Sequence, residues 1–156
     1  LEDTDTARFA HIRLPALGWG EKDGTVTNSE RVISRQRALF AAPGEARADW
    51  RIITDVAGAM GHAAAFDYPN AASVFREYAS MTALAAARGR KLDLTALAGL
   101  SDAAFDALEP LRWGGAHPLA DGYPTPSGKG RLVPVAPPPQ PVADPAFPFR
   151  LNTGRY

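Results

Sequence analysis

Most of the side chains that could do chemistry lie in one polar segment, residues 18–31, with the sequence GWGEKDGTVTNSER. Glu21 and Lys22 form an acid–base pair ahead of a tight turn at Gly24, and a second acid and base close the segment. A lysine in such a loop can bind an anionic group such as a phosphate. Taken alone, Lys22 is better explained as a surface lysine paired with its neighbours. The segment gains significance only together with other parts of the chain.

Two further places carry groups that suit a nucleotide. Asp49 stands at the start of an expected helix, where a carboxylate is most simply explained as a cap. Near the end of the chain, Gly154 has no Cβ, so a phosphate could approach the backbone there closely. Thr153 precedes this glycine, and Arg155 follows it with a fork of donors. On spacing alone, these residues are better explained by a plain turn at the end of a strand.

Catalytic and metal-binding groups are not expected in this chain. The sequence contains no cysteine, which excludes a thiolate nucleophile, a cysteine-bound zinc ion and an iron–sulfur cluster within these residues. His11, His62 and His117 lie far apart and share no spacing typical of metal ligands. Asp102 and Asp106 stand one helical turn apart, but aspartates near a helix start are better explained by the helix dipole.

The composition excludes several classes of partner. Seventeen basic and seventeen acidic side chains cancel, so no net field attracts nucleic acid or an anionic membrane. No run approaches the ~20 apolar residues that cross a bilayer, and the first residues lack the layout of a signal peptide. Together with the lack of cysteine, this favours a cytoplasmic location. The first residue is leucine rather than methionine, and the chain stops directly after an expected strand. We therefore expect a segment of a longer protein.

Periodicity indicates an α/β fold. A strand is expected over residues 9–17, ended by Pro15, and residues 25–37 are expected to form a loop with extended pieces. Helices are expected to begin at Asp49, after an Asn70 N-cap, and after a Ser101 N-cap. The apolar faces of the two longer helices are predicted to contain Trp50, Ile53, Ala57 and Met60, and Val74, Tyr78 and Met81. The charged residues Glu30, Arg31, Arg35 and Arg37 are expected to form a solvated face.

The character of the sequence changes at Pro110. Eleven of the fourteen prolines lie between Pro110 and Pro148, which indicates extended chain and turns without an amphipathic helix. Within this region, residues 123–135 are expected to form a hairpin whose return strand is 131–135. A further strand is expected to begin at Phe147.

Four blocks of sequence, taken in order, resemble a known family. They are EKDGTVTNSER, APGEARADW, GLSDAAFDALEP and PFRLNTGR. Together they resemble the bacterial molybdopterin oxidoreductases of the DMSO reductase superfamily, most closely the catalytic subunit of assimilatory nitrate reductase. The stretch SRQRA and the block GLSDAAFDALEP favour nitrate reductase over formate dehydrogenase. Two positions depart from the family pattern: Val32 stands where an arginine is usual, and His11 where an aspartate is usual.

The resemblance implies a domain organisation. Residues 1–113 would be the latter part of a Rossmann-like α/β domain that binds molybdopterin. Residues 114–146 would be a Pro/Gly-rich connecting segment with a hairpin. Residues 147–156 would be the first strand of a β-barrel-like domain that binds the molybdopterin dinucleotide.

The resemblance also implies cofactors and their contacts. In this family a large subunit holds a [4Fe–4S] cluster near its N-terminus and binds molybdenum through two molybdopterin guanine dinucleotides. By match, the contacts to the dinucleotide in this sequence are Lys22, Asp49, Thr153, Gly154 and Arg155. A lysine and an arginine suit the pyrophosphate, and a carboxylate can accept hydrogen bonds from guanine N–H groups.

The implied parent enzyme reduces nitrate to nitrite, with molybdenum taking the oxygen atom. Its partners would be the remainder of the same subunit and an electron donor, either a subunit or a ferredoxin, flavodoxin or NADH-linked reductase. The segment would be inactive alone. Two alternatives stay open: the parent could be a formate dehydrogenase or another molybdopterin oxidoreductase, or the chain could be a cofactor-free α/β interaction module.

Overall fold

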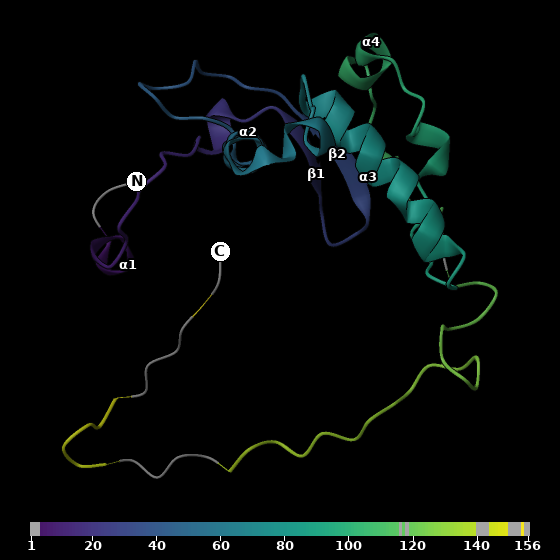
Figure 1. Ribbon diagram of the computed structural model, residues 1–156. Helices are drawn as coiled ribbons and strands as arrows, with labels where there is room; N and C mark the ends of the chain where they lie inside the picture. Colours follow the sequence, from purple (N-terminus) through teal and green to yellow (C-terminus); the bar gives the residue numbers. More distant parts are fainter. Residues whose placement is uncertain (1–3, 116, 118, 140–143, 150–153, 155–156) are drawn as a thin grey trace.

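A computed structural model describes residues 4–115, 117, 119–139, 144–149 and 154 (Figure 1). Helices and a small sheet occupy the first two-thirds of the chain, and turns and extended segments follow. The strands are β1 Gly24–Thr27, β2 Val32–Gln36 and β3 Leu111–Arg112. The α-helices are α1 Asp5–Arg8, α2 Asp49–Ala57, α3 Ala71–Ala86 and α4 Asp102–Asp106. Single helical turns are η1 Trp19–Glu21, η2 Gly58–His62, η3 Ala63–Ala65 and η4 Thr95–Leu97.

The three strands form an antiparallel sheet in the order β1-β2-β3. In the turn between β1 and β2, the Asn28 side-chain oxygen accepts hydrogen bonds from the backbone N–H of Glu30 at 2.9 Å and of Val32 at 3.0 Å. Arg31 completes the turn in the left-handed conformation, with φ 69°. The loop expected over 25–37 is therefore a hairpin. The alternation of apolar and polar residues is weak in this hairpin because β2 buries Ile33 and the charged Arg35 on one face.

The expected α/β class is confirmed in its coarse form, as a mixture of helices with a small sheet. The strand expected over 9–17 is wrong. In that stretch the structure has only an isolated parallel bridge between Ala16 and Arg47. Pro15 has no N–H to donate to a neighbouring strand. The segment therefore continues as irregular chain.

Helix α3 begins at its expected cap. The Asn70 side chain accepts a hydrogen bond from the Ser73 N–H at 2.9 Å. The face that α3 buries, however, consists of Ala72, Phe75, Ala79 and Thr82, and the predicted Tyr78 and Met81 are exposed. Small alanines let the following loop approach closely, and Thr82 Oγ1 accepts a hydrogen bond from the Leu94 N–H at 2.8 Å.

The core lies between α3, β2 and α4. Ile33, Phe75, Leu94 and Phe105 are buried there, and the rings of Phe75 and Phe105 lie 5.4 Å apart. Ser101 caps α4 as expected, accepting a hydrogen bond from the Ala104 N–H.

Arg35 enters this core from β2. Its side chain is 3% exposed and its guanidinium lies 4.1 Å from the centre of the Phe105 ring. The prediction that Arg35 belongs to a solvated face is wrong. Its two carboxylate partners, Asp23 directly before β1 and Asp106 at the end of α4, compensate the charge, each at 2.9 Å.

Unlike α3, helix α2 leaves most of its apolar face exposed to solvent. Ile53, Val56 and Met60 are 60%, 46% and 69% exposed, while Ala57 is buried. Gly61 ends the helical run with φ 89°, a conformation that a side chain disfavours. Among the described residues, no helix combines the length and apolar character that a membrane crossing requires.

In the proline-rich region, residues 119–139 run away from the helices and sheet as turns and extended chain (Figure 1). Tyr123 and Gly128 close a turn through a 3.0 Å hydrogen bond from the Tyr123 N–H to the Gly128 carbonyl. The expected return strand at 131–135 is wrong: these residues carry no strand pairing. Phe147 forms an isolated bridge with Asp144. The strand expected over 147–156 lies largely outside the described residues.

Candidate cofactor-binding site

Lys22 and Asp49, which are 27 positions apart in sequence, meet in the structure. The Lys22 ammonium lies 2.7 Å from an Asp49 carboxylate oxygen. Lys22 directly follows η1, and Asp49 is the first residue of α2. The N-cap of α2 is Ala48, which makes no side-chain capping bond, so the interpretation of Asp49 as a simple cap is wrong. The carboxylate is directed to the lysine and to solvent, and it is 60% exposed.

The turn before Lys22 is held by its own polar contacts. The Glu21 carboxylate accepts a hydrogen bond from the Gly18 N–H at 2.7 Å. The Gln36 side chain donates to the Trp19 carbonyl at 2.9 Å, which ties η1 to the end of β2. Lys22 is therefore presented from an anchored turn, and its freedom is limited at its base.

The pair sets the charge state of Asp49. The hydrogen bond from Lys22 is the main reason why the pKa of Asp49 lies below its usual range; burial opposes this shift, and the lysine's positive charge adds to it. Asp49 is therefore an ionised acceptor at neutral pH.

This lowered pKa predicts an acid-dependent loss of stability. Because the folded pKa of Asp49 lies below the unfolded value of about 3.9, its contribution is complete above that pH and disappears as the pH falls through the folded pKa. We expect the stability advantage of the native chain over Asp49→Asn, measured by urea unfolding, to be small, because both side chains are partly exposed, and to shrink below about pH 4. An advantage that grows with acidity would contradict the ion pair.

Lys22 and Asp49 stand at a hollow of about 340 Å³ between the start of β1, the start of α2 and one side of α3. Trp50 and Tyr78 contribute aromatic rings to its lining and Gln36 an amide. The other lining residues are Asp23, Gly24, Thr25, Ala48, Ala71, Val74 and Phe75. A cation, an ionised carboxylate and apolar ring surfaces together suit a ligand that is flat at one place and anionic at another.

Sequence reasoning found Lys22 and Asp49 in this hollow but missed Gln36, Trp50 and Tyr78 as site residues. Gln36 stands at the end of a strand that was expected to be a loop. The tyrosine was assigned to the packed side of α3, whereas it is 46% exposed and lines the hollow. These residues could have been found only if the strand over Gln36 and the exposed side of the helix at Tyr78 had been assigned correctly.

The third part of the expected site is not brought to this hollow by any described contact. Gly154 is exposed and has no atom within 4 Å of the place where a side chain would start. Thr153 and Arg155 lie outside the described residues. Their assignment stays a prediction.

The end of the polar segment, residues 27–31, has a structural role. The Arg31 guanidinium donates to the backbone carbonyl of Trp113 at 3.4 Å and to that of Gly115 at 3.2 Å. Glu30 pairs with Arg112 at 3.3 Å. These contacts hold the β1–β2 turn against β3. In the described part of the chain, no group of three or more His, Cys, Asp or Glu side chains is arranged to hold a metal ion.

Comparison with known proteins gives this site its context. Residues 2–59, which include both Lys22 and Asp49, match the family model for molybdopterin oxidoreductase. The chain belongs to the molybdopterin oxidoreductase family. The resemblance inferred from the four sequence blocks is thereby confirmed.

Similar proteins are named either nitrate reductase or formate dehydrogenase, as three relatives show. A nitrate reductase from Klebsiella oxytoca is 51% identical over 98% of this chain and 18% of its own length. A nitrate reductase from Shewanella frigidimarina is 40% identical over 98% of this chain and 18% of its own length. A formate dehydrogenase, the F420-dependent formate dehydrogenase 2 subunit alpha from Methanococcus maripaludis, is 34% identical over 97% of this chain and 22% of its length. The chain spans about a fifth of the length of these relatives.

Proposed function

We propose that the chain is a segment of the catalytic subunit of a molybdenum-dependent nitrate reductase, where it lines part of the site for a molybdopterin guanine dinucleotide. The observation that carries the proposal is the meeting of Lys22 and Asp49 at a hollow within the region that matches the family model. The higher identity to the nitrate reductases, 51% and 40%, favours nitrate over formate as substrate.

The residues present fit the nucleotide end of this cofactor. Lys22 can neutralise a phosphate, and ionised Asp49 can accept hydrogen bonds from the N–H groups of guanine. Both remain accessible, with side chains 34% and 60% exposed. A nucleotide would therefore compete with, or share, the ion pair that the two residues make. When bound, the molybdenum cofactor supplies the oxygen-atom transfer that converts nitrate to nitrite, and this chain's residues supply binding and orientation.

The rest of the assignment follows from the same proposal. Thr153, Gly154 and Arg155 would reach the cofactor from the start of the next domain, and residues 1–113 would complete a Rossmann-like domain. The [4Fe–4S] cluster would be held elsewhere in the subunit, because this chain has no cysteine. We place the enzyme in the cytoplasm, with a ferredoxin, flavodoxin, NADH-linked reductase or dedicated subunit as electron donor.

Activity assays with the full-length subunit test this proposal. With a reduced dye as electron donor, the subunit should reduce nitrate to nitrite, while the isolated 156-residue chain should show no turnover even after exposure to the cofactor. Oxidation of formate in place of nitrate reduction would move the assignment to formate dehydrogenase, for which the Methanococcus relative is the precedent by name. If isothermal calorimetry of the chain with GDP gave no heat and the subunit contained no molybdenum, the cofactor-free interaction module would replace both.

A further inference from the structure

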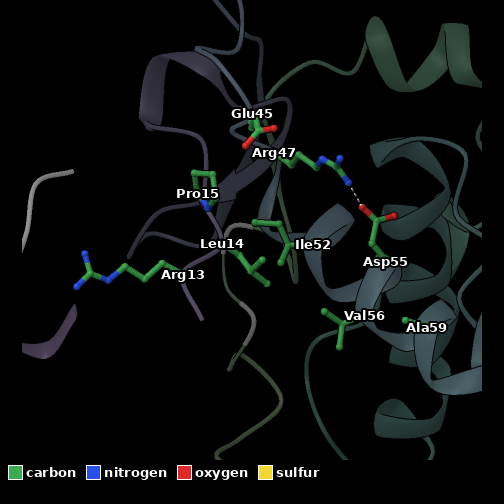
Figure 2. Close-up of a pocket in the computed structure, with 9 residues that line it drawn as sticks. All are labelled: Arg13, Leu14, Pro15, Glu45, Arg47, Ile52, Asp55, Val56 and Ala59. Carbon is green, nitrogen blue, oxygen red and sulfur yellow. Dashed lines mark hydrogen bonds and ion pairs between the residues drawn. The ribbon is translucent and has the colours of Figure 1, made fainter. Parts of the chain in front are cut away.

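A second hollow, of about 410 Å³, lies beside α2 and shares no lining residue with the first (Figure 2). Its apolar lining comes from Leu14 and Pro15 of the N-terminal segment and from Ile52, Val56 and Ala59 of α2 and η2. We call these five residues the α2 groove. Figure 2 shows Leu14, Ile52 and Val56 around the same space.

Four charged residues line the edge of the groove, Arg13, Glu45, Arg47 and Asp55. Arg47 reaches across to Asp55, and the two side chains pair at 2.6 Å. Because the two positive and two negative formal charges sum to zero, the edge offers no strong net charge to an ionic ligand. The chemistry of the groove therefore favours an apolar occupant.

Exposed apolar side chains also flank the groove residues in the sequence on both elements. On the α2 side, Ile53 and Met60 are 60% and 69% exposed. On the N-terminal side, Phe9 and Ile12 are 84% and 78% exposed. Contiguous apolar surface of this kind on a protein marks an interaction site. On α2 and η2 the residues Ile53, Val56 and Met60 recur at helical spacing, which distinguishes them from single scattered residues that need no explanation.

We propose that the α2 groove is the docking surface for an apolar segment of the remaining part of the catalytic subunit. The chain spans 18% of the two most identical nitrate reductases reported above, so a partner within the same polypeptide is available at high effective concentration. This inference rests on the proposed function, because it takes the rest of that subunit as the occupant. It makes α2 a shared element, with the nucleotide hollow at its first residue and the subunit interface along its outer face.

The first test compares one substitution in two settings. Val56→Lys places a charge in the groove, but lysine is at least as good a helix former as valine, so α2 itself should tolerate it. In the isolated chain, where Val56 is already 46% exposed, the thermal midpoint should be almost unchanged. In the full-length subunit, the same substitution should lower the midpoint by several degrees or abolish soluble accumulation, because the lysine would be buried without a partner. Val56→Leu, the matched apolar control, should preserve both.

A second measurement covers the case in which Val56→Lys prevents folding of the subunit. Because the chain has no cysteine, Val56→Cys introduces a thiol whose position in the sequence is unambiguous by mass spectrometry. In the full-length subunit this thiol should react with maleimide at least about tenfold more slowly than in the isolated chain, since reaction would require local opening. Equal reaction rates would overturn the proposal.

Two other occupants would give different results. If the isolated chain sediments as a dimer that Val56→Lys converts to monomer, and the thiol is protected in that dimer alone, the groove binds a second copy and the proposal is wrong. Failure of the proposed function is distinguishable, because it would appear as missing molybdenum or missing nitrate reduction while groove protection in the full-length subunit persists.

Discussion

Replacing Arg35 with methionine is expected to lower the free energy of unfolding of the chain by about 3 kcal/mol, the largest effect on stability that we expect from any single side chain. For a chain of this length, this corresponds to a fall of roughly 6–12 °C in thermal midpoint. The reason is that Arg35 joins the hairpin to α4 through a charge that is almost completely buried, with only 3% of its side chain exposed.

The arginine makes several kinds of contact at once. Its guanidinium donates to the backbone carbonyls of Gly24 and Gln36 as well as to the carboxylates of Asp23 and Asp106. Hydrogen bonds that involve a charged group contribute about 1.5–3 kcal/mol each when buried. Asp23 and Asp106 are 52% and 72% exposed, so water would replace much of what they lose. The net loss is therefore well below the sum of the bonds.

Methionine keeps most of the stem volume over the Phe105 ring, so the measured loss reports the polar contacts rather than a cavity. The Nε atom of Arg35 is buried without a hydrogen-bond partner in the structure, and removing it offsets part of the loss. Arg37→Met is the matched control: this exposed arginine also donates to Asp106, through the backbone carbonyl, but its stem is not buried. Urea unfolding of the two variants should differ by about 2 kcal/mol or more. Equal stabilities would contradict the role assigned to Arg35.

Arg35 also shows where sequence reasoning reaches its limit. Local signals were sufficient for the helix starts, because Asn70 and Ser101 bond to backbone groups three residues away. Arg35 instead finds Asp106, 71 positions along the chain. An arginine looks solvated in sequence unless the carboxylate that compensates it can be identified, and periodicity does not identify partners across such a separation.

The same reasoning applies to the helix faces. The apolar faces predicted for α2 and α3 assumed that large apolar residues turn inward, yet α3 buries alanines and a threonine because a loop packs closely against it. In α2 and η2, Ile53 and Met60 remain on the surface. Periodicity locates an apolar face, but it does not say whether that face is covered by the same chain. Motif order identified Lys22 and Asp49 without any knowledge of the fold, which explains why the two charged site residues were found when the aromatic ones were not.

Exchanging the two charges at the nucleotide hollow is expected to separate structure from cofactor binding. Lys22→Asp alone places two carboxylates where the 2.7 Å ion pair stood, and Asp49→Lys alone places two ammonium groups there. Like charges disfavour each other, so each single variant should reduce stability slightly. Because each also removes a proposed cofactor contact, it should weaken cofactor binding by at least about tenfold and lower the molybdenum content of the full-length subunit. The double variant restores an ion pair in reversed orientation.

The double variant decides between the two roles. If the pair only fastens η1 to α2, the reversed pair should restore both the urea midpoint and the molybdenum content. If Lys22 neutralises a phosphate and Asp49 accepts from guanine, the reversed pair should restore the midpoint but leave molybdenum low, because an aspartate would face the phosphate and a lysine cannot accept a hydrogen bond. We expect the second result, measured as molybdenum per subunit by elemental mass spectrometry. Recovery of both quantities would remove Lys22 and Asp49 from the cofactor site and leave the hollow without an assigned ligand.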